Sequence, residues 1–217
     1  MRWGKHGRHG PRGYHHGNLK EALMQAALDL IAEKGPAGFT FADAARGAGV
    51  SPAAPYRHFR DRDELLASVA LQGFERFAAM LATAWNGGKP NTRTAFENLG
   101  KAYLAFARTE PAYYSAMFEA GIPHANNPDL LAAGERAFAI LRDASEAMIA
   151  ELPARDRPPV MMMALHIWAL SHGIASLFGR GDAASRKLPM RPEELLEAGV
   201  LLYLRGLGLP GGAGAGG

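Results

Sequence analysis

Apolar side chains recur every three or four residues along most of this 217-residue chain, which is the spacing of amphipathic helices. No segment has the two-residue alternation of a half-buried strand, so we expect an all-α protein. The pattern predicts a first helix that begins at a cap formed by Asn18 and ends at Gly35 and Pro36. Two short helices should follow within residues 40–59, and residues 86–91, NGGKPN, mark the clearest later break.

A long fourth helix is predicted from about Arg62 to Trp85, and it would link the N-terminal helices to the rest of the chain. Its expected core face consists of Leu65, Leu66, Val69, Phe74, Phe77 and Leu81. Further helices are expected over Thr92 to Thr109, Glu110 or Pro111 to Phe118, Leu130 to Leu152, Val160 to Phe178, and Glu193 to Leu207.

The sequence TFADAARGAGVSPAAPYRHF, which begins at Thr40, has the pattern of a helix-turn-helix. Thr40 can cap the first short helix, and Asp43 completes a capping box. Gly49 allows the left-handed turn, and Ser51 then caps a second helix with Pro52 at its first position. The first helix carries a small apolar face made of Ala42, Ala44, Ala45 and Ala48.

The longer string AARGAGVSPAAPYRHFRDRDELL, from Ala44 to Leu66, resembles the tetracycline-repressor (TetR) family of bacterial transcription regulators. An alanine-rich helix, Gly-Val-Ser, Tyr-x-His-Phe and a following long helix stand at the family's spacing. Arg62 departs from the family, which often has lysine there; both are cationic, but their hydrogen-bonding geometry differs. The alternative for the same residues is a helical hairpin that only packs.

The second short helix carries the residues that would meet DNA. Capped at Ser51, it would bring Pro52 and Ala53 near thymine methyl groups and Arg57 near a guanine. The resemblance implies phosphate contacts from Thr40, Tyr56, His58 and Arg62. The candidate DNA-binding set is therefore Thr40, Ser51, Pro52, Ala53, Tyr56, Arg57, His58 and Arg62.

The distribution of charge agrees with a nucleic-acid partner. Residues 1–62 hold ten Lys or Arg and five Asp or Glu, whereas the remaining 155 residues hold fourteen and sixteen. Basic charge thus gathers beside the predicted reading helix, which is the distribution expected of a phosphate-binding surface. The chain contains no cysteine, which excludes disulfides, zinc-thiolate sites and cysteine catalysis.

The first seventeen residues contain four basic side chains, no acidic ones and five glycines, so we expect a disordered arm. Arg8 and Arg12 could follow the minor groove or the phosphates, or the arm could add only diffuse charge. The arm lacks the apolar run of a secretory signal, and we expect a cytoplasmic protein. No metal site is predicted, because glycines leave no fixed geometry for His6, His9, His15 and His16.

The stretch between Arg157 and Arg180 has no charged residue and is long enough to span a bilayer. Polar residues are scattered along it and no aromatic belt flanks it, so a buried helix is favoured over a membrane span. A homodimer could cover this helix, with Ala169 and Gly173 allowing close approach. A second apolar stripe would complete a four-helix bundle, formed by Leu195, Leu196, Val200, Leu201 and Leu204.

Two C-terminal segments extend the resemblance. The motif WALSHG contains Trp168, His172 and Gly173, and it matches the Trp/His-Gly pattern of one TetR subgroup, as does the segment at 108–121, RTEPAYYSAMFEAG. The resemblance implies dimerisation through the last two helices and an effector cavity inside the preceding ones. Candidates for lining that cavity, or for plain packing, are Tyr103, Phe106, Met117, Phe118, Phe138, Trp168 and His172.

Together these patterns predict four parts: a disordered basic arm over 1–17, a helix-turn-helix domain over 18–62, an effector-binding and dimerisation domain over 63–209, and a disordered tail over 210–217. The expected function is a dimeric repressor that a small apolar effector releases from a near-palindromic operator in double-stranded DNA. No cofactor is expected, and no nucleophile elbow, phosphate loop or HExxH motif indicates an enzyme. An interaction protein or an enzyme that reuses the fold remains the alternative.

Overall fold

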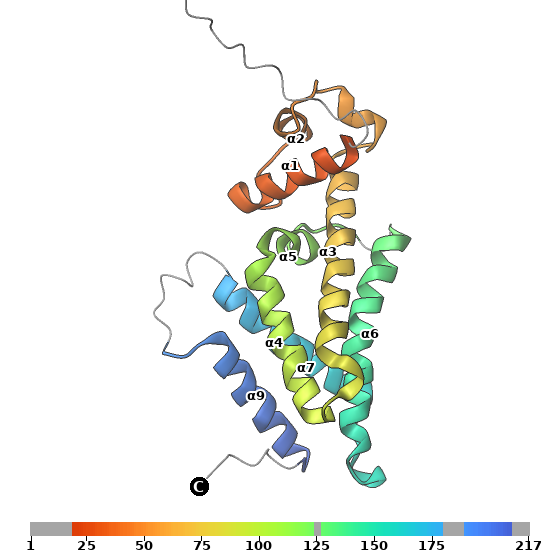
Figure 1. Cartoon of the computed structure of the whole chain (residues 1–217), viewed down its shortest axis with the longest axis vertical. Helices are drawn as coiled ribbons and strands as arrows, with labels where there is room; N and C mark the ends of the chain where they lie inside the picture. Colours follow the sequence, from red (N-terminus) through yellow and green to blue (C-terminus); the bar gives the residue numbers. More distant parts are fainter. Residues whose placement is uncertain (1–18, 124–126, 180–188, 210–217) are drawn as a thin grey trace, which may run out of the picture.

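The computed structural model describes residues 19–123, 127–179 and 189–209. The predicted cap at Asn18, the basic arm and the C-terminal tail lie outside these ranges. The described residues form helices and no strand, which confirms the all-α prediction. A small head of N-terminal helices stands at one end of a longer helical body (Figure 1). The elements are α1 Leu19–Lys34, α2 Phe41–Gly47, η1 Ala54–Arg57, α3 Arg62–Trp85, η2 Asn86–Gly88, α4 Thr92–Thr109, α5 Pro111–Phe118, α6 Pro128–Ala150, η4 Ala154–Asp156, α7 Val160–Gly179 and α9 Pro192–Gly206.

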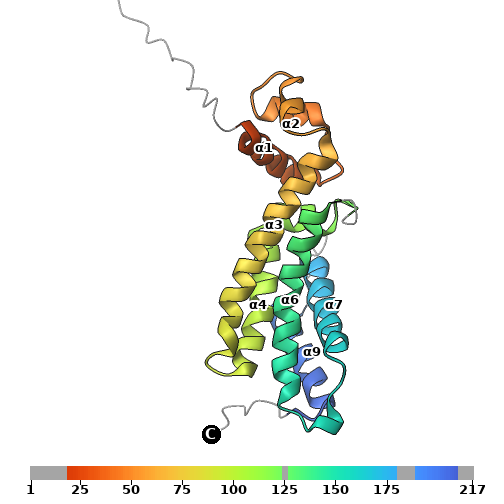
Figure 2. The same ribbon diagram turned by 90° about the vertical axis from the view of Figure 1, so that its right-hand side faces the viewer.

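Helix α3 joins the head to the body and continues along the body, between α4 and α6 in Figure 1 and along one side of the body in Figure 2. It packs against α1 in the head and against α4, α5 and α6 in the body. All six apolar residues predicted for its core face are buried. At Gly73 the helix approaches α5 closely, because an added Cβ would lie 2.8 Å from the sulfur of Met117.

The core of the head combines small residues with larger apolar ones, among them Leu23, Phe39 and Phe59. Ala44 and Ala45 of α2 are fully buried, whereas Ala42 is exposed, so the predicted alanine face is narrower than expected. Helix α2 approaches α1 closely at Gly47, where an added Cβ would lie 3.0 Å from the Cβ of Ala26. Phe39, in the connection between α1 and α2, is 4% exposed.

Helix α6 begins two residues before the predicted start at Leu130. The side chain of Asn127 accepts a hydrogen bond from the Leu130 N–H at 3.1 Å, and Pro128 occupies the first helical position. Proline suits that position because its missing N–H would have no partner within the helix. The helix ends at Ala150 rather than Leu152.

Helix α7 is only partly covered by its own subunit. By length and composition alone, α7 and the segment Arg62–Gly88 could each cross a membrane. Inside the subunit, however, one third of the most apolar window of α7 is buried, and half of the corresponding window of Arg62–Gly88.

The structure corrects the predicted stripe on α9, because Leu196, Val200 and Leu204 are buried within the subunit. They pack α9 onto α4 and α7, and Leu202 is 70% exposed instead.

Candidate nucleic-acid interface and effector cavity

The element after the turn is a short 3-10 helix, Ala54–Arg57, and not the predicted helix capped by Ser51. Its N-cap residue is Ala53, and no side chain caps it. The backbone carbonyl of Ser51 accepts a hydrogen bond from the Ala54 N–H at 3.0 Å. Pro52 and Pro55 lack the N–H groups that an α-helical ladder needs, so the tighter one-turn form replaces it.

The candidate base-reading residues lie on the outer side of this element. Pro52, Ala53 and Arg57 are exposed, and Tyr56 is 64% exposed. The ring of Tyr56 packs edge-on against Phe41 at 5.1 Å between centroids. The outer surface of this element therefore combines apolar, aromatic and cationic side chains. Two residues anchor it from below, the buried Pro55 and Phe59.

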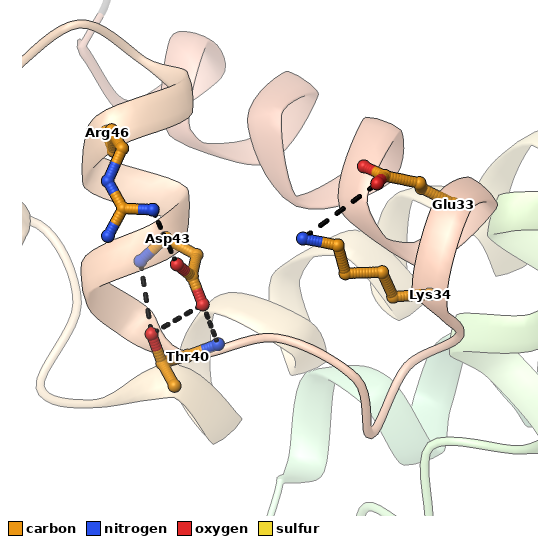
Figure 3. A network of polar contacts seen from close by, with 5 residues as sticks. All are labelled: Glu33, Lys34, Thr40, Asp43 and Arg46. Atoms are coloured by element: carbon orange, nitrogen blue, oxygen red, sulfur yellow. Dashed lines mark hydrogen bonds and ion pairs between the residues drawn. The ribbon is translucent and has the colours of Figure 1, made fainter.

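Thr40 is fixed in the predicted capping box at the start of α2 (Figure 3). Its hydroxyl donates to the Asp43 carboxylate at 2.7 Å and accepts from the Asp43 N–H at 3.2 Å. Arg46 also donates to Asp43, at 3.0 Å. These hydrogen bonds orient an exposed residue that the resemblance assigns to phosphate contact, but they also occupy its hydroxyl proton.

Replacing Thr40 by alanine should lower the free energy of unfolding by about 1 kcal/mol, because the helix loses its cap. Hydrogen bonds from Thr40 hold the pKa of the Asp43 carboxyl below its ordinary value of 3.8. The stabilisation from Asp43 is therefore present above that value and is lost as the pH falls below it. Chemical denaturation of the wild type and of Thr40→Ala, at neutral pH and near pH 3, measures this effect. The difference in free energy of unfolding between the two proteins should be smaller near pH 3.

Thr109→Ala is the matched control for this prediction, since the Thr109 hydroxyl only donates to the Ala105 carbonyl within α4. We expect it to change stability by less than about 0.5 kcal/mol. An equal loss in the two variants would show that the capping box does not stabilise the head.

Arg62 has an internal role that the sequence did not reveal. Its Nε donates to the carbonyl of Phe39 at 2.8 Å, and one terminal nitrogen donates to the carbonyl of Pro36. The guanidinium also lies over the Phe39 ring, 4.8 Å from its centroid. The first residue of α3 therefore ties the α1–α2 connection to the long helix. The other predicted phosphate contact beside the turn, His58, is exposed.

Three of the effector candidates line one cavity in the body, namely Tyr103, Phe138 and Trp168. Its walls come from α3, α4, α6 and α7 and contain no charged side chain. The cavity measures about 20 Å³, which is room for about one water molecule. A larger ligand would therefore have to displace side chains.

The remaining candidates lie beside this cavity or in the core. The ring of Phe118 lies 6.3 Å from Trp168 and 5.0 Å from His172, between centroids. Phe106 is fully buried against Phe77, with 4.9 Å between the ring centroids. Met117 is buried against α3 at Gly73. The structure thus gives Phe106 and Met117 packing roles.

A polar network beside the cavity includes one residue that the sequence reasoning did not select, Tyr114. Its hydroxyl lies 2.9 Å from His172 Nδ1, and the Tyr103 hydroxyl lies 3.0 Å from the same nitrogen. Burial lowers the pKa of His172, and the negative charge of Glu119 offsets part of that shift. The pKa of the Tyr103 hydroxyl is raised mainly by burial and further by the neighbouring Tyr114. The tyrosine pair at 113–114 was visible in the sequence, but nothing there placed one hydroxyl beside His172.

Within the described ranges, no group of three or more His, Cys, Asp or Glu side chains is arranged to hold a metal ion. His166 instead hydrogen-bonds the Tyr203 hydroxyl at 3.2 Å, between α7 and α9. The four histidines of the N-terminal arm lie outside the residues that the structure describes.

Comparisons with known protein families match the head and most of the body. The family model described as "Bacterial regulatory proteins, tetR family" matches residues 23–69. The model described as "Tetracyclin repressor-like, C-terminal domain" matches residues 96–203. No curated protein is similar enough to count as a match.

Solved structures resemble the chain over most of its length. A protein of unknown function from Rhodococcus sp. RHA1 is 30% identical, with 89% of this chain and 97% of that one covered and a TM-score of 0.70. The TetR family transcriptional regulator PfmR from Thermus thermophilus is 21% identical, with 84% and 97% covered and a TM-score of 0.66. A tetR-family regulatory protein from Rhodococcus RHA1 is 19% identical, with 89% and 99% covered and a TM-score of 0.68.

At these identities, the last two structures support the fold alone, whereas the family models identify the head and the body separately. Regulators of this family are soluble proteins that bind DNA, respond to small-molecule effectors and act as dimers. The helix-turn-helix head, the long connecting helix and the helical body make this chain a member of the TetR family of bacterial DNA-binding transcriptional regulators.

Proposed function

We propose that this protein is a repressor that binds a near-palindromic operator as a homodimer and leaves it when a small, mostly apolar effector binds in the body. The observation that carries the proposal is the exposed turn of the head, where Tyr56 is 64% exposed and Arg57 and His58 are exposed beside it. Aromatic and cationic side chains exposed together on a helix-turn-helix suit a DNA partner.

In this proposal the exposed turn reads the major groove. Pro52 and Ala53 contact thymine methyl groups, and Arg57 donates to a guanine. Tyr56 and His58 contact phosphates, and Thr40 does so when its hydroxyl turns from Asp43 to the DNA. These contacts fix the position of the head on the duplex without specifying sequence. Ser51, exposed at the start of the turn, belongs to the same proposed DNA-binding set.

The homodimer would form through the uncovered face of α7. This face carries exposed small or apolar residues at intervals of three or four, and it has no charge: Met162, Leu165, Ala169, Gly173 and Leu177. An added Cβ at Gly173 would meet no atom within 4 Å in the subunit, which leaves room for a partner helix. The neighbouring helix α9 adds Leu202. A two-fold axis here would match half-sites about 34–36 Å apart, or a multiple of that distance.

Release by an effector requires that the ligand bind one arrangement of the two heads more tightly than the other. Helix α3 is the proposed lever, since Phe77 and Leu81 line the cavity and Arg62 holds the head. A release of about 100-fold needs roughly 2.7 kcal/mol of coupling, within the usual range for allosteric sites.

Arg57→Ala should relax specificity at one base pair of each half-site, at a cost of about 1–3 kcal/mol on the preferred sequence. Arg60→Ala is the matched control, because the Arg60 side chain is 82% exposed and pairs with Asp61 at 3.1 Å. Binding to single-base operator variants measures the effect. Equal losses by Arg57→Ala on every sequence would remove the base-reading role of this residue.

Selection from a pool of randomised duplexes tests the proposed function without knowledge of the operator. The wild-type protein should enrich a two-fold symmetric motif, and Arg57→Ala should enrich the same motif with one degenerate position per half-site. Recovery of no motif would instead favour the second candidate, a helical interaction protein or an enzyme that kept the fold without operator binding.

A further inference from the structure

The most distinctive polar feature of the body is the meeting of three uncharged groups at one point. The hydroxyls of Tyr103 and Tyr114 lie 3.0 Å and 2.9 Å from Nδ1 of His172. The three residues come from α4, α5 and α7, so the network joins three helices. A neutral imidazole nitrogen has one lone pair or one proton, whereas each hydroxyl can both donate and accept. The network can therefore turn its protons toward another hydrogen-bonding group without creating a charge.

This network lies between two cavities. Tyr103 lines the apolar cavity that Trp168 also lines. Tyr114 lines a second cavity of about 200 Å³, where α5 and α7 face Ile31 and Ala32 of α1. A group that entered the network from the first cavity would therefore shift a tyrosine that faces the DNA-binding head.

The uncharged first cavity disfavours a ligand charge of either sign, because the charge would be desolvated there without a partner, and Glu119 adds repulsion against an anion. No charged residue lines the first cavity, and Glu119 is the one charged residue that lines the second. Its negative charge already acts on His172. A ligand carboxylate would be desolvated without a cation to pair with it, next to another carboxylate, and both effects are unfavourable.

We propose that the effector is an uncharged, largely apolar molecule with one hydroxyl or carbonyl group, and that this group exchanges hydrogen bonds with Tyr103, Tyr114 and His172. This inference rests on the proposed function, because it specifies the ligand of the same regulator. Ring contacts supply the apolar part of the site, since Phe118 touches both Trp168 and His172. Because the first cavity holds about one water molecule, the aromatic rings must move apart when the ligand enters.

Calorimetry with two matched series of probes tests the proposed ligand class. The first series is naphthalene, 2-naphthol, 2-acetylnaphthalene, 2-naphthoate and 2-(aminomethyl)naphthalene. The second is 1-decanol, 2-decanone, decanoate and decylamine. In at least one series the hydroxyl or ketone compound should bind about tenfold more tightly than the other members, the gain expected from one well-placed hydrogen bond. Tightest binding of a carboxylate or an amine overturns the proposal, and so does binding of no probe.

Tyr114→Phe and Tyr103→Phe keep the rings and remove one hydroxyl each, so they should reduce the preference for the hydroxyl or ketone probe toward unity. Tyr113→Phe is the matched control on the same helix, because the Tyr113 hydroxyl donates to Gln72 at 2.6 Å and lies outside the network. An unchanged preference in Tyr114→Phe and Tyr103→Phe assigns the network to packing and overturns the proposal. The ranking of probes by the wild type stays decisive if a variant does not fold.

Operator binding distinguishes a failure of the proposed ligand class from a failure of the proposed function. A protein that binds operator DNA without ligand and releases it only with a charged probe contradicts the ligand class and leaves the proposed function in place. A protein that selects no DNA sequence contradicts the proposed function, whatever the calorimetry shows.

Discussion

The double substitution Ala169→Glu with Gly173→Glu should give monomers that have lost at least about 100-fold in operator affinity. Both residues are exposed on α7, and the subunit has space for a side chain at Gly173, so the fold should survive. In a dimer built on this face, four glutamates would be buried around the two-fold axis without partners. Each buried charge costs several kcal/mol, which is enough to prevent assembly.

Sedimentation velocity and DNA binding, measured on the same samples, test this prediction. The control is Ala79→Glu with Thr83→Glu, which has the same spacing on an exposed face of α3 and should stay dimeric. A wild-type protein that is monomeric at micromolar concentration would contradict the dimer. A double variant that remains dimeric would place the interface on another surface.

Arg62→Ala should lower the free energy of unfolding of the head by roughly 2–4 kcal/mol. The substitution removes the hydrogen bonds to the Phe39 and Pro36 carbonyls and the contact with the Phe39 ring. The head consists of α1 and two short elements around a small core, so a loss of this size should unfold it at moderate temperature. DNA binding should then fail on every sequence.

Thermal unfolding followed together with the salt dependence of DNA binding separates two roles for Arg62. An internal role predicts a lower melting temperature, with partial rescue by Arg62→Lys because lysine cannot hold two carbonyls in the same fork geometry. A phosphate contact alone predicts an unchanged melting temperature and a salt slope smaller by about one unit. The control Arg60→Ala should leave the melting temperature unchanged, since Arg60 pairs only with adjacent exposed groups.

The sequence was sufficient for the order of the helices and for most of their bounds. Helices α3 and α4 begin and end where the apolar spacing and the NGGKPN break predict. The capping box at Thr40 and the left-handed Gly49, with φ of 71°, also follow from local chemistry. These features depend on neighbours within a few residues, which a sequence displays directly.

The structure differs from the sequence predictions where two local signals compete, or where contacts between residues distant in the chain determine the outcome. Ser51 and Pro52 favour the start of an α-helix, but Pro55 removes another donor and a 3-10 turn forms instead. The apolar stripe of α9 could face a partner or its own subunit, and periodicity cannot distinguish these faces. The contact between Arg62 and the Pro36 carbonyl spans 26 positions of the chain, so no local pattern reveals it.

The candidate effector site shows the same limit. The aromatic residues of the body could be identified, but the sequence could not separate the cavity wall, with Tyr103 and Trp168, from the packed core, with Phe106 and Met117. It also did not indicate that Tyr114 shares a ring nitrogen of His172 with Tyr103. Such convergence is set by the relative rotation of three helices, which depends on packing along their whole length.

The most direct test of the central claim is the affinity of the purified protein for its selected duplex and for a shuffled duplex of equal length, each at two salt concentrations. Specific recognition by two heads predicts that the selected duplex binds at least about a thousandfold more tightly at physiological salt, and that raising the salt weakens both complexes. The expected stoichiometry is one dimer per duplex. Equal affinity for the two duplexes at both salt concentrations would contradict sequence-specific regulation by this protein.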